Sequence, residues 1–476
     1  MKRLIAMFAL FVGAMPWITL TTAATAQTPR SPNIIVVMTD DQRWDTLRSM
    51  PNVKALAREG VTYTNAFVPN SLCCPSRVAT LTGTNSHTNG VWGNSPPFGG
   101  FDGFDDGVSI ATVLHDHGYR TSFVGKYLNG YPQDHFRYVP PGWDDWFAFD
   151  TGTFYDYFAA VDGRRSVFHG SDPGDYSGRV MTRKAISYID AAGDRPFFLY
   201  FAPAAPHTQS GEEGPSAAVP DPRDVDAYAG IQPWRPASYG NRDPSRDLPQ
   251  YLRDRSWSRR QRNHTDLLRQ RQLESLIGVD RSVGKLLSVI PDNTIVVFMS
   301  DNGYLWGEHR WHSKLVPYEE SIRIPLVIRY PHGPGGVVDD RLALNIDLVP
   351  TILGEVGLDA ATPTAIDFAS GLPVPPEGLD LRGSERRTSF PLEHWDDDLV
   401  VPGYCGIRTA DGWMYARYWD RESPDNGFET LYDVGADPFT TQNLADDPAS
   451  ATMKRFLRTE TERLCAPAPP FYEWGP

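Results

Sequence analysis

The segment at residues 73–77, Cys-Cys-Pro-Ser-Arg, combines a nucleophile with the features of an anion site. Pro75 suits the first turn of a helix, because a proline lacks the N–H group that would remain unpaired there. Residues 76–81 have a helical composition, and Gly83 can end that helix. Cys73 is therefore predicted at a helix N-terminus, where free N–H groups and the helix dipole favour an anion, and Arg77 adds a positive charge one turn later. This combination is suited to the transfer of a sulfuryl or phosphoryl group.

Two pairs of oxygen-bearing side chains follow two apolar runs that lie far apart in the sequence. The run at residues 33–38 leads to Asp40 and Asp41, and the run at residues 294–299 leads to Asp301 and Asn302. Carboxylate and amide oxygens are ligands for hard cations such as Ca²⁺ or Mg²⁺ and poor ligands for Zn²⁺. Each pair could instead cap a helix that follows its strand. Because the same arrangement occurs twice, we expect a metal site.

Apolar runs alternate with amphipathic segments before residue 384. The runs at 33–38, 196–201 and 294–299 have the composition of strands buried on both faces, and helices are predicted at 110–117, 179–191 and 259–290. This alternation predicts an α/β fold with a large, mostly parallel mixed sheet flanked by helices. Sites in such sheets form beyond the C-terminal ends of the strands, where His207 follows the second of these runs.

The pattern changes from residue 384 onward. Short candidate strands at 406–410, 413–418 and 429–433 precede a candidate helix at 449–463. They predict a smaller α+β subdomain with an antiparallel sheet over residues 384–476. The catalytic domain is then assigned to residues 31–383, and residues 211–256, which are rich in Pro, Gly, Asp and Arg, are predicted to be a surface insertion within it.

The first 26 residues are predicted to be a secretory signal peptide. Lys2 and Arg3 precede an apolar run, and cleavage is expected after Ala26. The run is short for a membrane span, so we expect a secreted or periplasmic protein without a stable membrane anchor. The chain carries 45 Lys and Arg against 59 Asp and Glu, and this balance argues against nucleic acid as a partner. An anionic substrate must therefore be attracted by local positive charge.

Taken together, these motifs resemble those of the type I, formylglycine-dependent sulfatases. Residues 73–83 read C-x-P-S-R-x-x-x-L-T-G, the signature in which the first Cys is oxidised to formylglycine, and further matches stand in order at Thr39–Gln42, Gly125–Asn129, Ala205–His207 and Asp301–Tyr304. The resemblance covers nearly the whole chain after the signal peptide and implies the alkaline phosphatase-like fold. Residues 87–91 and 125–129 are most similar to the N-acetylglucosamine-6-sulfatase branch, which suggests a sulfated sugar as substrate.

The resemblance implies a role for each matched side chain. Cys73, converted by a formylglycine-generating enzyme, would be the nucleophile and would also bind the metal. The other metal ligands would be Asp40, Asp41, Asp301 and Asn302, with calcium as the usual ion and magnesium as an alternative. Arg77 would steady the hydrated aldehyde, Lys126 and Lys314 would bind sulfate oxygens, and His207 with Lys314 would assist the departing alcohol.

Two consequences of the resemblance concern neighbouring residues. Many sulfatases carry a His at the position of Leu128, so the base for sulfate release is open among Asn129, His87 and His309. Conversion of Cys73 leaves three thiols, of which Cys405 and Cys465 lie in the same predicted subdomain. These two are predicted to form a disulfide in an oxidising compartment.

The predicted function is therefore the hydrolysis of sulfate monoesters on a sulfated small molecule or glycan. One alternative is a phosphomonoester or phosphonate-ester hydrolase on the same fold, because the two anions share their shape and their need for a metal. The other is a non-catalytic protein that binds sulfated glycans. The intact set of Cys73, Arg77, Lys126, His207 and Lys314 argues against the second alternative.

Overall fold

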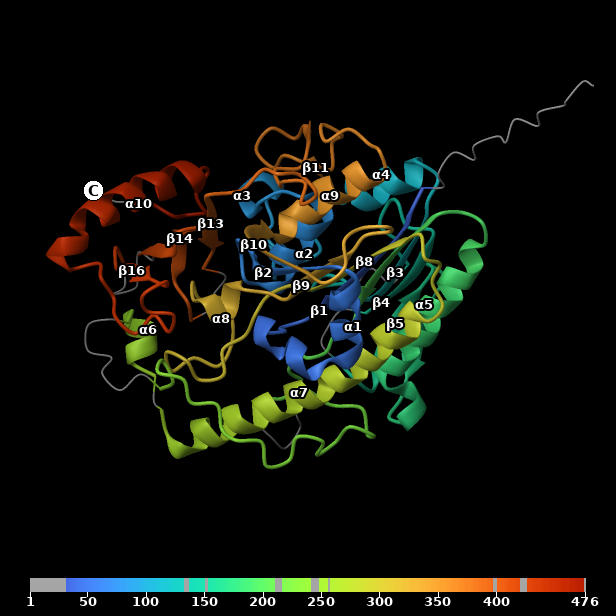
Figure 1. Cartoon of the computed structure of the whole chain (residues 1–476), viewed down its shortest axis with the longest axis horizontal. Coiled ribbons are helices and arrows are strands. Elements are labelled where there is room, and N and C mark those ends of the chain that lie inside the picture. The colour runs from blue at the N-terminus through green and yellow to red at the C-terminus, as the bar shows by residue number, and fades with distance from the viewer. Residues whose placement is uncertain are drawn as a thin grey trace, which may run out of the picture. The chain divides into compact units, whose positions relative to one another are not determined.

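The computed structural model of the chain describes residues 31–131, 137–149, 153–209, 216–240, 248–255, 257–396, 400–419 and 426–474. From Pro32 onward the described residues form one compact unit (Figure 1). The predicted signal peptide lies outside the described residues, as does part of the predicted insertion. Among the helices in the described part of the chain, none is both long enough and apolar enough to cross a membrane.

The described elements alternate between strands and helices before residue 384, as the sequence predicts. The strands are β1 Asn33–Thr39, β2 Val61–Phe67, β3 Arg120–Lys126, β4 Asp145–Phe149, β5 Tyr157–Val161, β6 Arg165–His169, β7 Phe197–Ala202, β8 Thr294–Ser300, β9 Leu326–Arg329, β10 Val337–Leu344, β11 Ala365–Ile366, β12 Pro373–Val374, β13 Ser389–His394, β14 Gly403–Thr409, β15 Trp413–Trp419 and β16 Glu429–Asp433. The α-helices are α1 Pro51–Glu59, α2 Cys73–Thr82, α3 Ser86–Asn89, α4 Ile110–Asp116, α5 Ser177–Ala192, α6 Gln250–Arg253, α7 Arg259–Leu287, α8 Glu319–Ile322, α9 Leu348–Glu355 and α10 Ala451–Leu464.

Ten strands form one mixed sheet in the order β10-β2-β9-β8-β1-β7-β3-β4-β5-β6. The strands β8, β1, β7, β3 and β4 at its centre run parallel to one another, and the antiparallel pairs lie toward both edges. The predicted α/β fold, with a mostly parallel mixed sheet, is thereby confirmed. Because the central strands are parallel, their C-terminal ends meet along one edge of the sheet.

Strand β1 shows why these runs are apolar throughout. Ile34, Val36 and Met38 face the hydrophobic core that α2, α4 and α9 cover, whereas Ile35 and Val37 face the core beneath α1, α5 and α7. A strand with a helix layer on each face has no side that contacts water, so both sets of alternating residues are apolar. Each fully buried side chain of this size stabilises the fold by roughly 1.5–3 kcal/mol.

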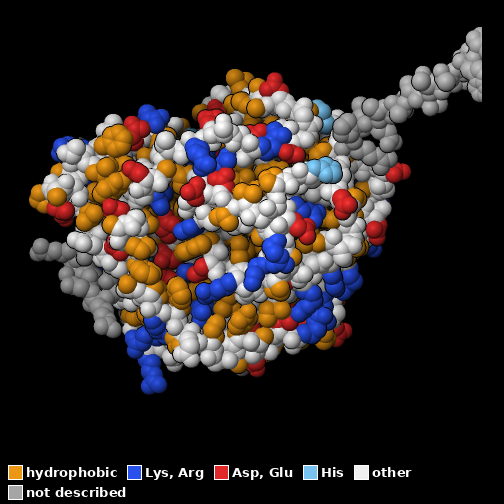
Figure 2. Space-filling model, in the orientation of Figure 1, with side chains coloured by type: hydrophobic (Ala, Val, Ile, Leu, Met, Phe, Trp, Pro, Cys, Tyr) orange, Lys and Arg blue, Asp and Glu red, His pale blue; other side chains and the backbone are white. Residues whose placement is uncertain are grey.

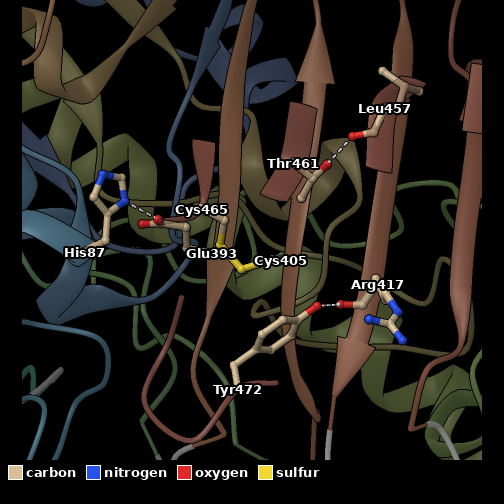
Figure 3. Close-up of a disulfide and its surroundings, with 8 residues drawn as sticks. All are labelled: His87, Glu393, Cys405, Arg417, Leu457, Thr461, Cys465 and Tyr472. Carbon is tan, nitrogen blue, oxygen red and sulfur yellow. Dashed lines mark hydrogen bonds and ion pairs between the residues drawn. A yellow bond between two sulfur atoms is a disulfide. The ribbon is translucent and has the colours of Figure 1, made fainter. Parts of the chain in front are cut away.

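The C-terminal region forms an antiparallel sheet in the order β13-β14-β15-β16. The predicted strands correspond to β14, β15 and β16, and β13 is an additional strand that the sequence analysis did not predict. One face of this sheet shares a core with residues near the large sheet, among them Phe67 and Tyr318, and α10 covers the other face. Cys405 of β14 and Cys465 after α10 form the predicted disulfide (Figure 3). The boundary at residue 384 stays a prediction, since the described residues from Pro32 onward form one unit.

Charged side chains are unevenly spread over the surface. On the face in Figure 2, Lys and Arg side chains gather in the lower half, over α1, α5 and α7, with acidic side chains scattered among and above them. The net charge of −14 is therefore a poor guide to local potential.

Candidate active site

Helix α2 places Cys73 at the C-terminal edge of the large sheet. The helix begins at Cys73 and ends at Gly83, whose φ of 73° lies in the left-handed region that glycine adopts without strain. The backbone N–H of Cys74 donates to Asn94 Oδ1 at 2.9 Å, which pairs one of the N–H groups of the first turn. All residues of α2 are buried, and Cys73 is 1% exposed. The predicted helix, its start and its end are confirmed.

Two lysine side chains point at the sulfur of Cys73. Lys314 Nζ lies 2.7 Å and Lys126 Nζ 3.5 Å from the Cys73 Sγ atom, and Asp40 Oδ1 lies 3.7 Å from it. Burial raises the pKa of the Cys73 thiol, although both ammonium groups oppose this shift. The sulfur thus lies at a place where buried cations would hold an anionic oxygen or sulfate group.

Three carboxylates gather beside Cys73 because β1 and β8 are neighbours in register. Thr39 pairs with Ser300, so the residues that follow the two strands lie side by side. One oxygen each of Asp40, Asp41 and Asp301 lies within 4.8 Å of the others. Asp41 has a φ of 67°, and its N–H donates to Asp301 Oδ1 at 3.1 Å. The strand-end pairs therefore face each other. Neither pair caps a following helix, since the 3-10 helix after β1 is preceded by Arg43 and α8, the helix after β8, by Tyr318, both without a side-chain cap.

Asn302 completes this oxygen cluster. Its Nδ2 donates to Asp41 Oδ1 at 2.7 Å, while its Oδ1 is buried and has no hydrogen-bond partner among the described residues. A buried amide oxygen without a partner is costly unless a ligand pairs with it. Three carboxylates and this oxygen form a donor set that fits a hard divalent cation such as Ca²⁺ or Mg²⁺.

Three buried cations balance the three carboxylates. Lys126 Nζ lies 2.5 Å from Asp40 Oδ2, and Lys314 Nζ lies 2.5 Å from Asp41 Oδ1. Arg77 Nε donates to Asp301 Oδ2 at 2.9 Å, and Nη2 forms an ion pair with the same oxygen at 2.8 Å. Burial by itself would raise the pKa of Asp40, but Lys126 and the other cations outweigh it and hold that pKa well below its usual range. A divalent cation added to this balanced set would leave an excess of positive charge, which suits an anionic substrate.

His207 reaches the cluster from the loop after β7. Its Nε2 lies 3.8 Å from Asp41 Oδ2, and one of its ring nitrogens lies within 4.8 Å of both Cys73 Sγ and a carboxylate oxygen of Asp40. Burial lowers the pKa of His207, whereas the nearby carboxylates of Asp40 and Asp41 oppose this shift. Its side chain is still 26% exposed, which leaves one face open to the solvent side of the site.

The structure thus brings together every side chain predicted for the site, but Arg77 makes different contacts from those expected. Its guanidinium bonds Asp301 and, through Nη1 at 2.7 Å, the carbonyl oxygen of Lys126, so it links the ends of β8 and β3. Its positive charge lies close enough to Cys73 for electrostatic interaction. The role of Arg77 toward the hydrated aldehyde stays a prediction.

The three candidates for the base of sulfate release contact groups other than the Cys73 sulfur. The N–H of Asn129 donates to the sulfur of Cys74 at 3.1 Å. His87 pairs with Glu393, and His309 stacks on Tyr318 with ring centroids 3.9 Å apart. Burial lowers the pKa of His309 to about 3. Within the described residues, His207 is the histidine grouped with Cys73 and Asp40.

Asn94 is a residue of the site that sequence reasoning missed. It holds the N–H of Cys74 from the loop between α3 and α4, a few residues beyond the motif at residues 87–91. A lone Asn in a loop rich in Gly and Pro gives no signal in the sequence. Only the folded loop brings it to the start of α2.

Comparison with known proteins matches nearly the whole described chain. The family model described as Sulfatase matches residues 32–358, and that of the C-terminal region of N-sulphoglucosamine sulphohydrolase matches residues 307–466. An extracellular sulfatase Sulf-1 homolog of Caenorhabditis elegans is 30% identical over 387 residues, covering 78% of this chain and 52% of the relative. An N-acetylglucosamine-6-O-sulfatase of Bacteroides thetaiotaomicron is 26% identical over 487 residues, covering 87% of this chain and 83% of the relative. The chain thus spans about half the length of the first relative and most of the second.

Solved structures share the fold at lower identity. A structure in complex with its substrate D-glucosamine-2-N,6-O-disulfate has a TM-score of 0.73 and 23% identity, over 92% of this chain and 98% of that one. The phosphonate monoester hydrolase of Silicibacter pomeroyi has a TM-score of 0.69 and 18% identity, over 92% of this chain and 95% of that one. At such identities these likenesses concern the fold alone.

Proposed function

Because this chain belongs to the sulfatase family, we propose that it hydrolyses the sulfate monoester of a sulfated sugar, with formylglycine made from Cys73 as the nucleophile. The observation that carries the proposal is the convergence of Lys126, Lys314 and Asp40 on the Cys73 sulfur. That sulfur stands in for the oxygens of a hydrated aldehyde. When present, formylglycine supplies a hydroxyl that attacks sulfur and a second hydroxyl that allows the sulfate to be expelled afterwards.

The cluster of Asp40, Asp41, Asp301 and Asn302 would hold the divalent cation of this site. The unpaired, buried Asn302 Oδ1 and the all-oxygen donor set support a hard cation, with calcium as the first choice and magnesium as the second. Such a cation supplies a positive charge that lowers the pKa of a bound hydroxyl and offsets the charge of a sulfate oxygen. Asp40 and Asp41 now bond the two lysines, so these lysines would shift toward the sulfate oxygens.

The two lysines would stabilise the negative charge that develops during the reaction, and His207 would supply a proton. As the S–O bond of a sulfate ester breaks, negative charge gathers on the bridging oxygen and remains on the sulfuryl oxygens. Lys126 and Lys314 are buried, and their pKa values are raised because nearby carboxylates outweigh the effect of burial, so both stay charged. His207 at the open side of the cluster would place a proton on the departing alcohol, with Lys314 beside it.

The substrate is proposed to be a 6-O-sulfated N-acetylglucosamine, free or within a glycan. The motifs at residues 87–91 and 125–129 and the Bacteroides relative both point to this sugar. We further propose that a formylglycine-generating enzyme matures the chain and that the mature protein acts in the periplasm or outside the cell.

The proposal is tested by measuring which class of ester the mature enzyme hydrolyses fastest. The protein is coproduced with a formylglycine-generating enzyme, and release of sulfate from 6-O-sulfated N-acetylglucosamine is compared with release of phosphate and phosphonate from matched esters. We expect sulfate release to dominate, and mass spectrometry of the tryptic peptide to place the aldehyde on Cys73. Faster hydrolysis of the phosphonate ester would instead favour the alternative function on this fold. Glycan binding without turnover by fully converted protein would favour a non-catalytic role.

A further inference from the structure

A pocket lined by aromatic side chains opens at one end of the four-stranded C-terminal sheet. Its volume is about 320 Å³, and Trp395, Trp419, Phe471 and Tyr472 are among its lining residues. Trp395 is 8% exposed, whereas Phe471 is 80% exposed. A Phe side chain that remains so exposed beside other aromatic rings is a feature of binding surfaces.

The segment that carries Phe471 is fixed to the sheet at two points. The disulfide between Cys405 and Cys465 anchors the chain after α10 to β14, and the Tyr472 hydroxyl donates to the carbonyl oxygen of Arg417 in β15 at 3.0 Å (Figure 3). The Tyr472 ring also lies 6.4 Å from the Trp419 ring. The pocket is therefore formed in advance, so a ligand would not have to order it on binding.

One loop connects this pocket to the start of α2. Phe98 places its ring 5.3 Å from Trp395 and 5.9 Å from Phe471, both in edge-to-face contact. Four residues earlier in the same loop, Asn94 holds the N–H of Cys74. At the same end of the sheet, the Tyr404 hydroxyl donates to the carbonyl oxygen of Leu315, the residue after Lys314. The pocket is thus joined to the active site from two directions.

We propose that this pocket binds a sugar ring of the substrate next to the one that carries the cleaved sulfate, a proposal that rests on the proposed function. Aromatic rings bind the C–H faces of a sugar, and a few polar groups then fix its orientation. The polar side chains of this pocket are the carboxylates of Asp396 and Glu473. They accept hydrogen bonds from hydroxyl or amine groups and repel sulfate and carboxylate groups. The bound ring is therefore an uncharged or amino sugar, so the two sites select for different charges on adjacent rings.

The experiment compares substrates with and without the second ring. The mature enzyme and its Phe471→Ala variant are assayed on 6-O-sulfated N-acetylglucosamine and on the same sugar joined to an unsulfated ring, at either end. Because Phe471 is exposed, its removal spares the fold. We expect the variant to raise KM for one of the two disaccharides about tenfold, the usual scale for one stacked aromatic contact. KM for the monosaccharide and kcat for both should be unchanged.

Phe456→Ala is the matched control, because Phe456 is an exposed phenylalanine on α10 away from the pocket-lining residues. A second variant, Glu473→Gln, should lower KM for a disaccharide that carries a sulfate on each ring. Equal KM values for Phe471→Ala and the parent on both disaccharides would overturn the proposal.

Calorimetric titration with an unsulfated N-acetylglucosamine disaccharide tests the pocket independently of turnover. Saturable binding that Phe471→Ala abolishes would support the pocket even if no sulfate ester were hydrolysed, in which case only the proposed function would fail. No binding to the parent protein would overturn the inference while leaving the proposed function intact.

Discussion

The loop that carries Asn94 and Phe98 contacts both the C-terminal edge of the large sheet and the end of the small sheet. These two regions differ in the charge and in the exposure of their side chains. At the large sheet, charged side chains are fully buried and pair with one another, as Lys126 does with Asp40. At the end of the small sheet, the pocket is lined by aromatic rings that range from Trp395, which is 8% exposed, to Phe471, which is 80% exposed, and a disulfide anchors the segment before Phe471. The proposed chemistry therefore lies in a region of fixed, buried charges, whereas the proposed sugar pocket lies in a region of aromatic rings and a disulfide. Variants in each region test whether the two are separable.

The largest effect is expected from the nucleophile. Cys73→Ala should lower kcat on a sulfated sugar on the order of 10⁵-fold, as removal of a nucleophile does in other hydrolases. Cys74→Ala is the matched control and should keep most of the activity, because the Cys74 sulfur contacts Asn129, through the N–H at 3.1 Å and Oδ1 at 3.7 Å. Steady-state kinetics and peptide mass spectrometry measure both. An aldehyde on Cys74 in active enzyme would contradict the assignment.

The next effect concerns the carboxylate that bonds both Arg77 and the N–H of Asp41. Asp301→Ala removes a proposed metal ligand and the carboxylate that accepts from Arg77 Nε, so kcat should fall about 10²-fold to 10³-fold. Asp301→Asn keeps an oxygen donor and should lose less. Activity is measured after chelation and dialysis and again after addition of calcium, magnesium or zinc. Full activity of metal-free protein, or rescue by zinc alone, would refute the proposed site.

Removal of the disulfide should change stability and leave the chemistry intact. Cys405→Ala with Cys465→Ala opens a bridge between residues 60 positions apart and should lower the free energy of unfolding by about 2–4 kcal/mol. Chemical denaturation with and without reductant measures the loss, and the double variant should be insensitive to reductant. For a small aryl sulfate, kcat per folded molecule should be unchanged. A large fall in that kcat would show that the two regions are not separable.

The smallest effect is a pH-dependent contribution from the pair of His87 and Glu393 (Figure 3). Burial would lower the pKa of His87, but Glu393, with weaker help from Glu377 and Asp367, raises it to about 9. A raised histidine pKa gives stability that is complete below about pH 6.5 and is lost as the pH rises through about 9. Glu393→Gln should therefore lower the free energy of unfolding at pH 6 by about 1–3 kcal/mol.

At pH 10 the same variant should differ much less from the parent. Glu462→Gln, which removes an exposed pair with Arg458, is the control and should change stability little at either pH. An equal deficit for Glu393→Gln at pH 6 and pH 10, measured by denaturation, would exclude a charged His87.

The elements predicted most accurately are those whose residue pattern has one dominant physical cause. Strands β1 and β8 are apolar on both faces, so their patterns are unambiguous, and α7 begins at the predicted residue, Arg259. Strand β3 was not predicted, because Arg120, Thr121 and Ser122 interrupt its apolar pattern. The strands β5, β6, β9 and β10 were also missed: polar residues interrupt β6 and β10, whereas β5 and β9 are apolar but only five and four residues long.

For the site, the motifs located the carboxylates and Cys73 because strand ends and a helix start fix them. The placement of Lys126 and Lys314 came from the family resemblance, since no local pattern distinguishes a buried lysine from an exposed one. The aromatic pocket could not be predicted, because Trp395, Trp419 and Phe471 are brought together only by the pairing of the small sheet and the disulfide.

The burial of α2 determines when Cys73 can be oxidised relative to folding. Cys73 is 1% exposed and the residues after it are buried as well, so a second enzyme cannot reach this segment in the folded protein. The residues that enclose it come from positions as distant as Lys314, so the segment stays open until most of the chain has been synthesised. The proposed oxidation must therefore finish within this interval. A variant that folds faster should contain a smaller share of converted molecules, as measured by mass spectrometry of the Cys73 peptide.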